Sequence, residues 1–349
     1  MRIAILGYGT IGQGVSDVIY NNRSRIESVI EEPIEIAHIF DRHEHEEDPL
    51  SDKITQSIED ILSDDEIDIC IEALGGLHPA FEYVSSLLQN GISVATSNKA
   101  LVAEYGPKLF QMADSSGAIF RFEGAVGGGI PILHTLNNSL VFEEVEEIYG
   151  ILNGTTNFIL SKMLDLDMSY EEVLREAQEM GYAEKDPTDD VEGYDAARKI
   201  AILLSMATGK KCDYQSIETE GISGISESDM DYARRNGLKL RLLAQAKRDG
   251  EAFKCKVSPV YISDESPLYS VNDSFNAILV KTNSLGESMY YARGAGASPT
   301  ASAVVSDLIE IAKSFNLDEV NDLSRRWTEE ELEIGKFDEE VSWIKPLLR

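Results

Sequence analysis

The densest group of reactive side chains in this 349-residue sequence lies between Gly181 and Lys199. Asp195 and Lys199 are four residues apart, so they share one face if this segment is helical. A lysine that is held beside a carboxylate and backed by apolar residues can donate or accept a proton. An ordinary exposed ion pair, worth roughly a few tenths of a kcal/mol, is the simpler interpretation of the spacing taken alone.

A glycine-rich turn lies near the start of the chain. Gly7-Tyr8-Gly9-Thr10-Ile11-Gly12 fits the pattern G-x-G-x-x-G and directly follows the short apolar run 2–6. The first glycine allows a tight turn, the second lets the backbone approach a pyrophosphate, and the third lets helix and strand pack closely. The helix that begins here offers free N–H groups and a positive dipole end to phosphates. We therefore expect a dinucleotide-binding site.

Two neighbouring residues bear on which dinucleotide binds. Asp41 follows the predicted strand 34–40 and lies 29 residues after Gly12, a longer interval than usual that a long first helix explains. Its carboxylate can bind the ribose hydroxyls of NAD, whereas the guanidinium of Arg42 can accommodate the additional phosphate of NADP. The two residues argue against each other, so the sequence leaves the cofactor preference open.

Two further loops carry small residues after predicted strands. The segment 122–131 contains four glycines and a closing proline, so it can turn backbone carbonyls inward as ligands of a hard cation. A hinge between two domains is the simpler interpretation of its spacing. The segment Asn153–Asn157 suits a helix cap close to a ligand, and a plain cap explains it equally well.

Strand-like and helix-like segments alternate over the first 122 residues. Apolar runs at 2–6, 34–40, 67–71, 92–96 and 118–122 alternate with helical patterns, which predicts an α/β fold with a Rossmann-type, doubly wound parallel sheet. Beyond about residue 135 the pattern predicts an α+β domain with a mixed sheet. Its expected elements are a strand at 145–152, helices at 157–164, 170–180, 192–208 and 238–246, and strands at 253–262 and 275–281. A helix at 301–314 and an acidic tail over 329–340 follow.

The composition excludes several classes of protein. With 31 Lys and Arg against 62 Asp and Glu, the net charge of −31 disfavours binding to nucleic acid or to a membrane surface. A hydrophobic content of 43% is typical of a folded protein rather than of a disordered chain. Three cysteines without metal-ligand spacing, and no signal-like or membrane-spanning run, lead us to expect a cytoplasmic protein. A high-salt cytoplasm would explain the acidity.

Four blocks, in order along the chain, point to one family. They are the fingerprint 7–12, Thr96-Ser97-Asn98-Lys99-Ala100-Leu101-Val102, the 123–131 loop followed by Asn153-Gly154-Thr155-Thr156-Asn157, and the signature 181–199. With these blocks, residues 1 to about 315 resemble homoserine dehydrogenase. The resemblance implies interconversion of L-aspartate 4-semialdehyde and L-homoserine with NAD(P), a step of threonine and methionine biosynthesis.

The resemblance also implies a domain organisation. It places a dinucleotide-binding domain at 1–135 and about 290–315, and a substrate-binding and dimerisation domain at 136–289. Residues 316–349 are then an acidic tail, too short for the regulatory domain that some members carry. We therefore expect no feedback control through such a domain. The resemblance also implies a homodimer.

Roles for single residues follow from the matched motifs. Lys199 resembles the residue that exchanges a proton with the substrate oxygen as hydride moves, and Asp195 resembles the carboxylate that orients substrate and lysine. Lys99 occupies the position of a second lysine, between cofactor and substrate. Cations suit these positions because a carbonyl that accepts hydride develops negative charge. The implied substrate-binding residues are Glu184, for the ammonium group, and Gly181, Tyr182, Asp190, Asn153, Gly154 and Thr155.

The resemblance assigns the remaining binding residues. The implied cofactor-binding residues are Gly7, Gly9, Thr10, Ile11, Gly12, Asp41, Arg42, Leu74, Gly75, Lys99, Gly294 and Gly296. The 123–131 loop matches the family's monovalent cation site, which replaces the hinge interpretation. The carbonyls expected to hold sodium or potassium are those of Glu123, Val126, Gly128 and Ile130.

Two alternatives compete with this assignment. One is another semialdehyde or amino-acid oxidoreductase that shares the Rossmann domain. Among these, the phosphorylating semialdehyde dehydrogenases need a nucleophilic cysteine, and none of the three cysteines has an activating sequence context. A cofactor-binding sensor that has lost catalysis is the alternative from another class. The intact Glu184, Asp195 and Lys199 speak against the sensor, whereas NAD(P)H binding without turnover would support it.

Overall fold

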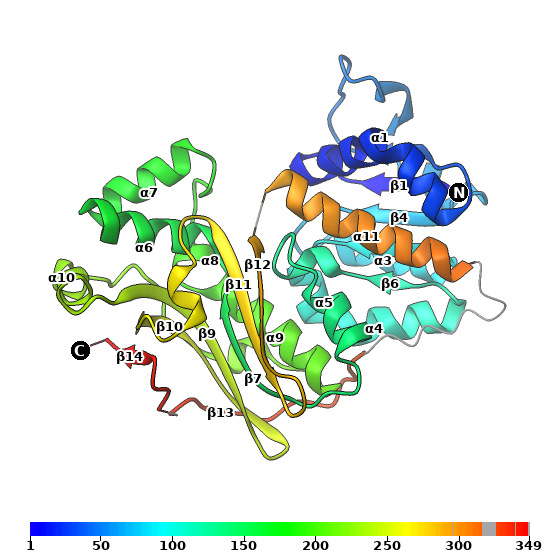
Figure 1. Cartoon of the computed structure of the whole chain (residues 1–349). Coiled ribbons are helices and arrows are strands. Elements are labelled where there is room, and N and C mark those ends of the chain that lie inside the picture. Colours follow the sequence, from blue (N-terminus) through cyan, green and yellow to red (C-terminus); the bar gives the residue numbers. More distant parts are fainter. Residues whose placement is uncertain (295, 316–325, 339, 348–349) are drawn as a thin grey trace. The chain divides into compact units, whose positions relative to one another are not determined.

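The computed structural model describes residues 1–294, 296–315, 326–338 and 340–347, and it contains two compact units (Figure 1). Unit 1 comprises Met1–Gly129 and Gly296–Arg326, and unit 2 comprises Ile130–Ala295 and Trp327–Arg349. Each unit is built on its own β-sheet. Within the described ranges, no helix combines the length and the apolar character needed to cross a membrane.

Unit 1 contains a parallel sheet with the strand order β3-β2-β1-β4-β5-β6. The direction of strand succession reverses between β1 and β4, which confirms the predicted Rossmann-type fold. In such sheets, ligands bind outside the carboxyl ends of the strands at the point of reversal. The strands are β1 (Arg2–Leu6), β2 (Glu35–Phe40), β3 (Ile54–Thr55), β4 (Ile69–Glu72), β5 (Ser93–Thr96) and β6 (Phe120–Arg121).

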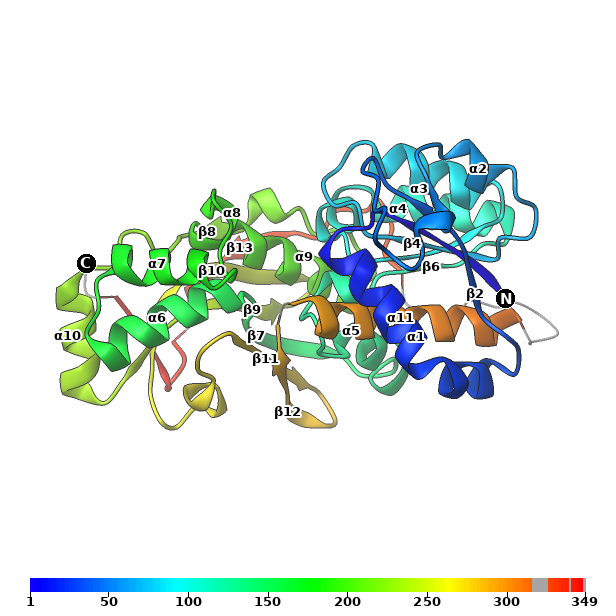
Figure 2. The same cartoon turned by 90° about the horizontal axis from the view of Figure 1, so that it is seen from above.

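Helices cover both faces of the unit 1 sheet (Figure 2). On one face α1 packs against α11, where a Cβ added to Gly14 would come within 3.3 Å of the Ala301 Cβ. The other face is covered by α3 and α4. Because both faces are covered, a strand such as β1 carries an unbroken apolar run. The helices are α1 (Thr10–Ile30), α2 (Glu59–Leu62), α3 (Ala80–Gln89), α4 (Lys99–Ser116) and α11 (Ala297–Phe315).

Unit 2 contains a mixed sheet with the strand order β12-β11-β7-β9-β10-β13, and β8 and β14 also pair with β10. The central strands are antiparallel, whereas β8 and β13 run parallel to β10. This architecture confirms the predicted α+β domain with a mixed sheet. The strands are β7 (Val145–Ile151), β8 (Glu218–Thr219), β9 (Lys239–Asp249), β10 (Ala252–Ile262), β11 (Phe275–Thr282), β12 (Gly286–Arg293), β13 (Ile334–Lys336) and β14 (Ile344–Pro346).

The prediction of a helix at 238–246 is wrong, because this segment forms most of β9. The buried apolar residues of the strand are Leu240, Leu242, Leu243, Ala244 and Ala246. A strand that is covered on both faces reads as a continuous apolar run, and periodicity alone does not distinguish such a run from a buried helix. The predicted strands at 253–262 and 275–281 are present as β10 and β11.

Three α-helices of unit 2, α6, α7 and α10, begin at residues whose side chains cap them. Asn153 accepts a hydrogen bond from the Thr156 N–H at the start of α6, and Ser169 forms a capping box with Glu172 at the start of α7. In α9 every residue from 199 to 206 is buried, which places this helix inside the unit. The helices are α5 (Ile132–His134), α6 (Gly154–Leu166), α7 (Tyr170–Glu179), α8 (Thr188–Val191), α9 (Tyr194–Thr208) and α10 (Glu227–Asn236).

Part of the segment predicted as an acidic tail lies on the unit 2 sheet. β13 runs parallel to β10 along Phe253–Cys255, and β14 runs antiparallel to β10 along Val260–Ile262. Trp327 and Leu332 are buried. Residues 316–325, 339 and 348–349 of the predicted tail lie outside the described residues.

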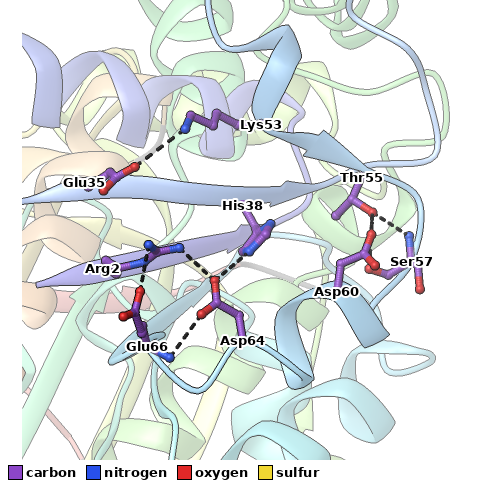
Figure 3. A network of polar contacts seen from close by, with 9 residues as sticks. All are labelled: Arg2, Glu35, His38, Lys53, Thr55, Ser57, Asp60, Asp64 and Glu66. Carbon is purple, nitrogen blue, oxygen red and sulfur yellow. Dashed lines mark hydrogen bonds and ion pairs between the residues drawn. The ribbon is translucent and has the colours of Figure 1, made fainter.

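An ion-pair network joins the amino end of β1 to the segment before β4 (Figure 3). The Arg2 guanidinium donates to Asp64 Oδ2 at 2.8 Å and to Glu66 Oε2 at 3.0 Å, and His38 Nε2 lies 2.9 Å from the same Asp64 oxygen. The hydrogen bond to His38 is the largest cause that lowers the pKa of Asp64 below its ordinary value of 3.8. Ionised Asp64 therefore stabilises folded unit 1.

We expect Asp64→Asn to lower the free energy of unfolding at neutral pH by about 1 kcal/mol, because the pair with Arg2 loses its negative charge. A lowered pKa stabilises the fold above the ordinary pKa, and this contribution disappears as the pH falls through the lowered value. Wild type and variant should therefore converge in acid. Urea unfolding followed by circular dichroism from about pH 7 to about pH 3 measures the difference.

Glu66→Gln is the matched control, because the Glu66 side chain is 73% exposed and its charge should contribute little. An equal loss in the two variants, or a loss in Asp64→Asn that persists in acid, would contradict the interpretation.

Candidate active site

The glycine fingerprint forms a tight turn between β1 and α1 in unit 1. Gly7 has a φ of +92°, and a Cβ on it would come within 2.8 Å of the Ala73 oxygen. A Cβ on Gly12 would come within 2.0 Å of the Gly7 oxygen, so neither position accepts a side chain. At Gly9 no described atom lies within 4 Å of a Cβ, and the approach to the first turn of α1 is open for a phosphate. The remaining residues of the predicted turn, Thr10 and Ile11, begin α1.

Asp41 follows the carboxyl end of β2 and contacts the fingerprint. Its Oδ2 accepts a hydrogen bond from the Tyr8 N–H at 2.7 Å, and its Oδ1 accepts one from the His43 N–H at 2.8 Å. Burial by itself raises the pKa of Asp41, but these backbone hydrogen bonds outweigh it and the pKa lies below its usual value. The side chain is therefore an ionised hydrogen-bond acceptor. The adjacent Arg42 is exposed.

The loop after Arg42 is strongly acidic. His45 Nε2 lies 3.8 Å from Asp41 Oδ1, which places the loop beside the predicted ribose site. A hollow in this loop is lined by Glu44, His45, Glu46, Glu47, Asp48 and Pro49. This part of unit 1 consequently carries a concentration of negative charge close to Asp41.

The loop after β4 and the start of α4 hold the other cofactor residues predicted on this side of unit 1. The N–H groups of Leu74 and Gly75 donate to Oε1 of Glu72, at 2.8 and 3.3 Å. Lys99 is the first residue of α4, which the Asn98 side chain caps. Glu72 is not among the residues predicted from the sequence, because no motif or period marks an acid at the end of an apolar strand.

Lys199 and Asp195 form a buried ion pair on α9 in unit 2. Lys199 Nζ donates to Asp195 Oδ2 at 2.7 Å and to the Leu152 carbonyl at 2.8 Å. The exposed fraction is 8% for Lys199 and 2% for Asp195, which excludes an ordinary exposed pair. A charged pair is retained in the interior only where hydrogen bonds satisfy it. The ammonium group is therefore held in one position.

Asn153 joins three elements around this pair. Its Nδ2 donates to Asp195 Oδ2 at 2.8 Å and to Asp190 Oδ1 at 2.7 Å. Its Oδ1 accepts a hydrogen bond from the Thr156 N–H at 2.8 Å, as the cap of α6. Both amide hydrogens are thus used within unit 2. The side chain predicted to contact substrate fixes two carboxylates, one on α8 and one on α9.

The loop that contains Gly181, Tyr182 and Glu184 is held against the start of α6. Thr155 Oγ1 donates to the Tyr182 carbonyl at 2.6 Å, and the Tyr182 and Phe158 rings lie 5.0 Å apart between centroids. Gly181 has a φ of +75°, a conformation that favours glycine. Glu184 is exposed. Unit 2 therefore presents the Glu184 carboxylate on a loop whose backbone is fixed.

Two of the predicted glycines allow close packing in unit 2. A Cβ on Gly154 would come within 2.8 Å of the Ser274 carbonyl oxygen, and one on Gly294 would come within 1.9 Å of Asn276 Cγ. Asn276 is fully buried, and within the described part of the chain its amide atoms have no hydrogen-bond partner. Gly296 has a φ of +116° and begins the second segment of unit 1.

The predicted cation ligands lie in the segment after β6. Glu123 is buried at the start of a short 3-10 turn, and its N–H donates to Oδ2 of buried Asp307 on α11 at 2.7 Å. Gly127 and Gly128 have φ values of +77° and +59°, which turn successive peptide planes. Buried carboxyl groups and turned carbonyls suit a hard cation. Glu123, Val126 and Gly128 belong to unit 1, and Ile130 is the first residue of unit 2.

Family models cover both halves of this arrangement. Residues 7–123 match the model described as "Homoserine dehydrogenase, NAD binding domain", and residues 131–309 match the model described as "Homoserine dehydrogenase". The chain belongs to the homoserine dehydrogenase family. Homoserine dehydrogenase is an NAD(P)-dependent oxidoreductase, so the resemblance seen in the sequence is confirmed.

Known homoserine dehydrogenases are similar over most of the chain. The homoserine dehydrogenase of Bacillus subtilis is 39% identical over 320 residues, which are 91% of this chain and 74% of the relative. A homoserine dehydrogenase structure from Thiobacillus denitrificans, also 39% identical, has a TM-score of 0.86 and matches over 91% of this chain and 74% of its own. A hyperthermophilic archaeal homoserine dehydrogenase in complex with NADPH is 28% identical, with a TM-score of 0.76 over 92% of this chain and 99% of its own.

We expect Asn153→Ser to separate capping from the positioning of the carboxylates. Serine remains a good helix cap, so the loss of stability should come only from the hydrogen bonds to the two carboxylates, and the free energy of unfolding should fall by about 1–3 kcal/mol. The shorter side chain does not reach Asp190 and Asp195, so turnover of L-homoserine should fall by about tenfold or more. Steady-state kinetics and urea unfolding measure the two effects.

Ser226→Ala is the converse control, because it removes the capping box of α10 and leaves Asn153 in place. This control should lose about 1 kcal/mol of stability and keep its turnover. Full turnover in Asn153→Ser would show that the amide does not position the carboxylates.

Proposed function

We propose that this chain interconverts L-homoserine and L-aspartate 4-semialdehyde, with Lys199 transferring the proton that accompanies the hydride. The observation that carries the proposal is the buried Lys199–Asp195 pair, which Asn153 and the Leu152 carbonyl hold in place. Membership of the homoserine dehydrogenase family supports it. A sensor without catalysis has no use for this pair, since burying two charges carries a large desolvation cost.

The proton transfer follows from the hydrogen bonds of Lys199. A bound nicotinamide cofactor supplies or accepts the hydride at the substrate carbon. Two of the three ammonium hydrogens of Lys199 are directed to Asp195 and to the Leu152 carbonyl, which leaves the third for the substrate oxygen. During reduction the ammonium stabilises the negative charge on this oxygen and donates its proton, and during oxidation the neutral amine accepts the hydroxyl proton.

The substrate's charged groups have candidate partners in unit 2. We propose that the exposed carboxylate of Glu184 binds the substrate ammonium group, because its loop is held in place by Thr155. A charge-assisted hydrogen bond of this kind fixes the orientation of a small amino acid. The other proposed contacts of the substrate are Gly181, Tyr182, Asp190, Asn153 and Gly154.

We propose that the residues that bind the dinucleotide are Gly7, Gly9, Thr10, Ile11, Gly12, Asp41, Arg42, Leu74, Gly75, Lys99, Gly294 and Gly296. The preferred cofactor is NAD, because the Asp41 carboxylate can accept a ribose hydroxyl and the acidic loop at 44–48 repels a second phosphate. Arg42 opposes this preference, because its guanidinium can accommodate the additional phosphate of NADP.

We further propose a bound monovalent cation and a homodimer. The cation ligands are the carbonyls of Glu123, Val126, Gly128 and Ile130, and the buried Glu123 and Asp307 carboxyl groups support a positive ion nearby. The homodimer follows from the family resemblance. A cytoplasmic location suits the free, buried cysteines Cys70, Cys212 and Cys255.

We expect Lys199→Ala to lower kcat for L-homoserine by about a thousandfold while the Kd for NADH stays within about twofold of wild type, since the lysine serves proton transfer. Absorbance of the reduced cofactor, at low and at molar potassium chloride, measures the rate. Lys162→Ala is the matched control, because this lysine pairs with Glu176 outside the candidate site. A folded wild type that binds cofactor but shows no turnover at either salt level would favour the sensor.

The cofactor preference is tested at Asp41. We expect wild type to use NAD with a kcat/KM at least about tenfold higher than NADP, and Asp41→Ser to lower this ratio by about tenfold. The physical reason is the loss of a fixed carboxylate that accepts from the ribose and repels a phosphate. In Arg42→Ala the residual use of NADP should decrease further. A wild type that prefers NADP would overturn the preference and assign the dominant role to Arg42.

A further inference from the structure

A buried carboxyl group in unit 1 has no role in the reaction proposed above. Glu72 is the last residue of β4, at the point where the strand order reverses, and its exposed fraction is 0%. A carboxyl group that is buried without partners is strongly unfavourable. The partners of Glu72 therefore indicate what the group does for the surrounding loops.

The carboxyl group of Glu72 accepts hydrogen bonds from two different segments, and Asn98 Nδ2 in the second segment also reaches Oε1 at 3.5 Å. Oε1 accepts hydrogen bonds from the N–H groups of Leu74 and Gly75, at 2.8 and 3.3 Å. Oε2 accepts a hydrogen bond from the hydroxyl of Thr96, the last residue of β5. One side chain thus joins the loop after β4 to the loop after β5.

The second of these segments leads directly to Lys99. Thr96 Oγ1 accepts a hydrogen bond from the Asn98 N–H at 2.9 Å, and the Asn98 side chain caps α4. Asn98 Nδ2 also donates to the Gly76 carbonyl at 2.7 Å, which ties the two loops together a second time. Because Lys99 is the first residue of α4, its backbone position depends on Thr96 and, through Thr96, on Glu72.

Within the described residues, every partner of Glu72 donates a hydrogen bond to it. Thr96 Oγ1 already accepts the Asn98 N–H, so its own hydrogen is directed at Glu72. This set of donors favours the carboxylate form. Burial opposes the charge and raises the pKa of Glu72 above its ordinary value, and the hydrogen bonds act against this shift. Glutamine has the same shape, but it places a donor where one of these oxygens accepts.

The geometry points to Glu72 as a positioning residue that couples the cofactor loop at Leu74–Gly75 to the segment that carries Lys99. Asp41 marks the adenosine side of the crevice on β2, so the β4–β5 side receives the nicotinamide half of a dinucleotide. Glu72 then acts on that half alone, and it does so through backbone groups rather than by touching the cofactor. The inference rests on the cofactor site proposed above.

The decisive variant is Glu72→Gln, studied in the full chain. We expect the Kd for NADH to rise about tenfold and kcat for L-homoserine to fall about tenfold, because both loops lose a fixed acceptor. The Kd for ADP, which lacks the nicotinamide half, should stay within about twofold of wild type. Isothermal titration gives the two Kd values, and a thermal melt confirms the fold.

Glu143→Gln is the matched control. This buried carboxylate accepts a hydrogen bond from the Ser284 N–H at 3.0 Å in unit 2, outside the proposed site. Its loss should leave kcat and both Kd values unchanged. If the Kd for NADH rises while the Kd for ADP does not, and if this happens only in Glu72→Gln, the result identifies positioning rather than a general loss of stability.

Thr96→Val is a second variant that leaves the bonds from Leu74 and Gly75 to Glu72 in place. We expect its kcat to fall about fivefold while its Kd for NADH stays close to wild type, because the bonds that Thr96 makes towards Lys99 are lost and the bond from Asn98 to the Gly76 carbonyl remains. This variant decides the question if Glu72→Gln does not fold. An unchanged kcat in Thr96→Val would overturn the coupling to Lys99.

Two results for a folded Glu72→Gln would overturn the inference. One is a wild-type kcat together with a wild-type Kd for NADH. The other is an equal rise in the Kd for NADH and the Kd for ADP, which indicates damage to the whole of unit 1. If wild type does not oxidise L-homoserine, the proposed function fails, but the comparison of NADH with ADP still decides whether Glu72 positions the Leu74–Gly75 loop.

Discussion

A lysine ammonium that has left water needs hydrogen-bond acceptors at fixed positions, and unit 2 supplies them to Lys199 from separate elements. The Leu152 carbonyl comes from the end of β7, and Asp195 comes from the preceding turn of α9. Asn153 then holds Asp195 from the start of α6. The buried length of α9 and the end of β7 are therefore constrained by one charge, because a shift of either element would leave this charge unsatisfied.

Unit 1 meets a different constraint, the close approach of backbone to backbone. Gly7 and Gly12 have no room for a side chain because the end of β1, the start of α1 and the loop after β4 lie within contact distance there. The same loop after β4 is turned by hydrogen bonds to Glu72. Unit 1 thus offers a tight turn and the N–H groups at the start of α1 to a ligand. Unit 2 instead offers charged side chains that can take part in proton transfer.

The sequence predicted those features that depend on local spacing. The interval of four between Asp195 and Lys199 places them on one helix face, and the glycine fingerprint predicts a strand, a turn and a helix. The burial of the pair depends on Leu152 and Asn153, which lie more than forty residues away and leave no periodic signal. The prediction of a helix at 238–246 is wrong because burial on both faces of β9 removes the alternation that identifies a strand.

The division of the chain has a consequence for its synthesis. Residues 130–295 of unit 2 separate the two segments of unit 1, and the helix α11 in the later segment covers α1 and its face of the sheet. A ribosome that adds about 5–20 residues per second takes roughly ten to thirty seconds to produce this insertion. During that time the isoleucine-rich surface of α1 and β1 has been translated, but α11, the helix that covers it, has not. For a nascent chain this surface is a site of aggregation or of chaperone binding until residue 315 has left the exit tunnel.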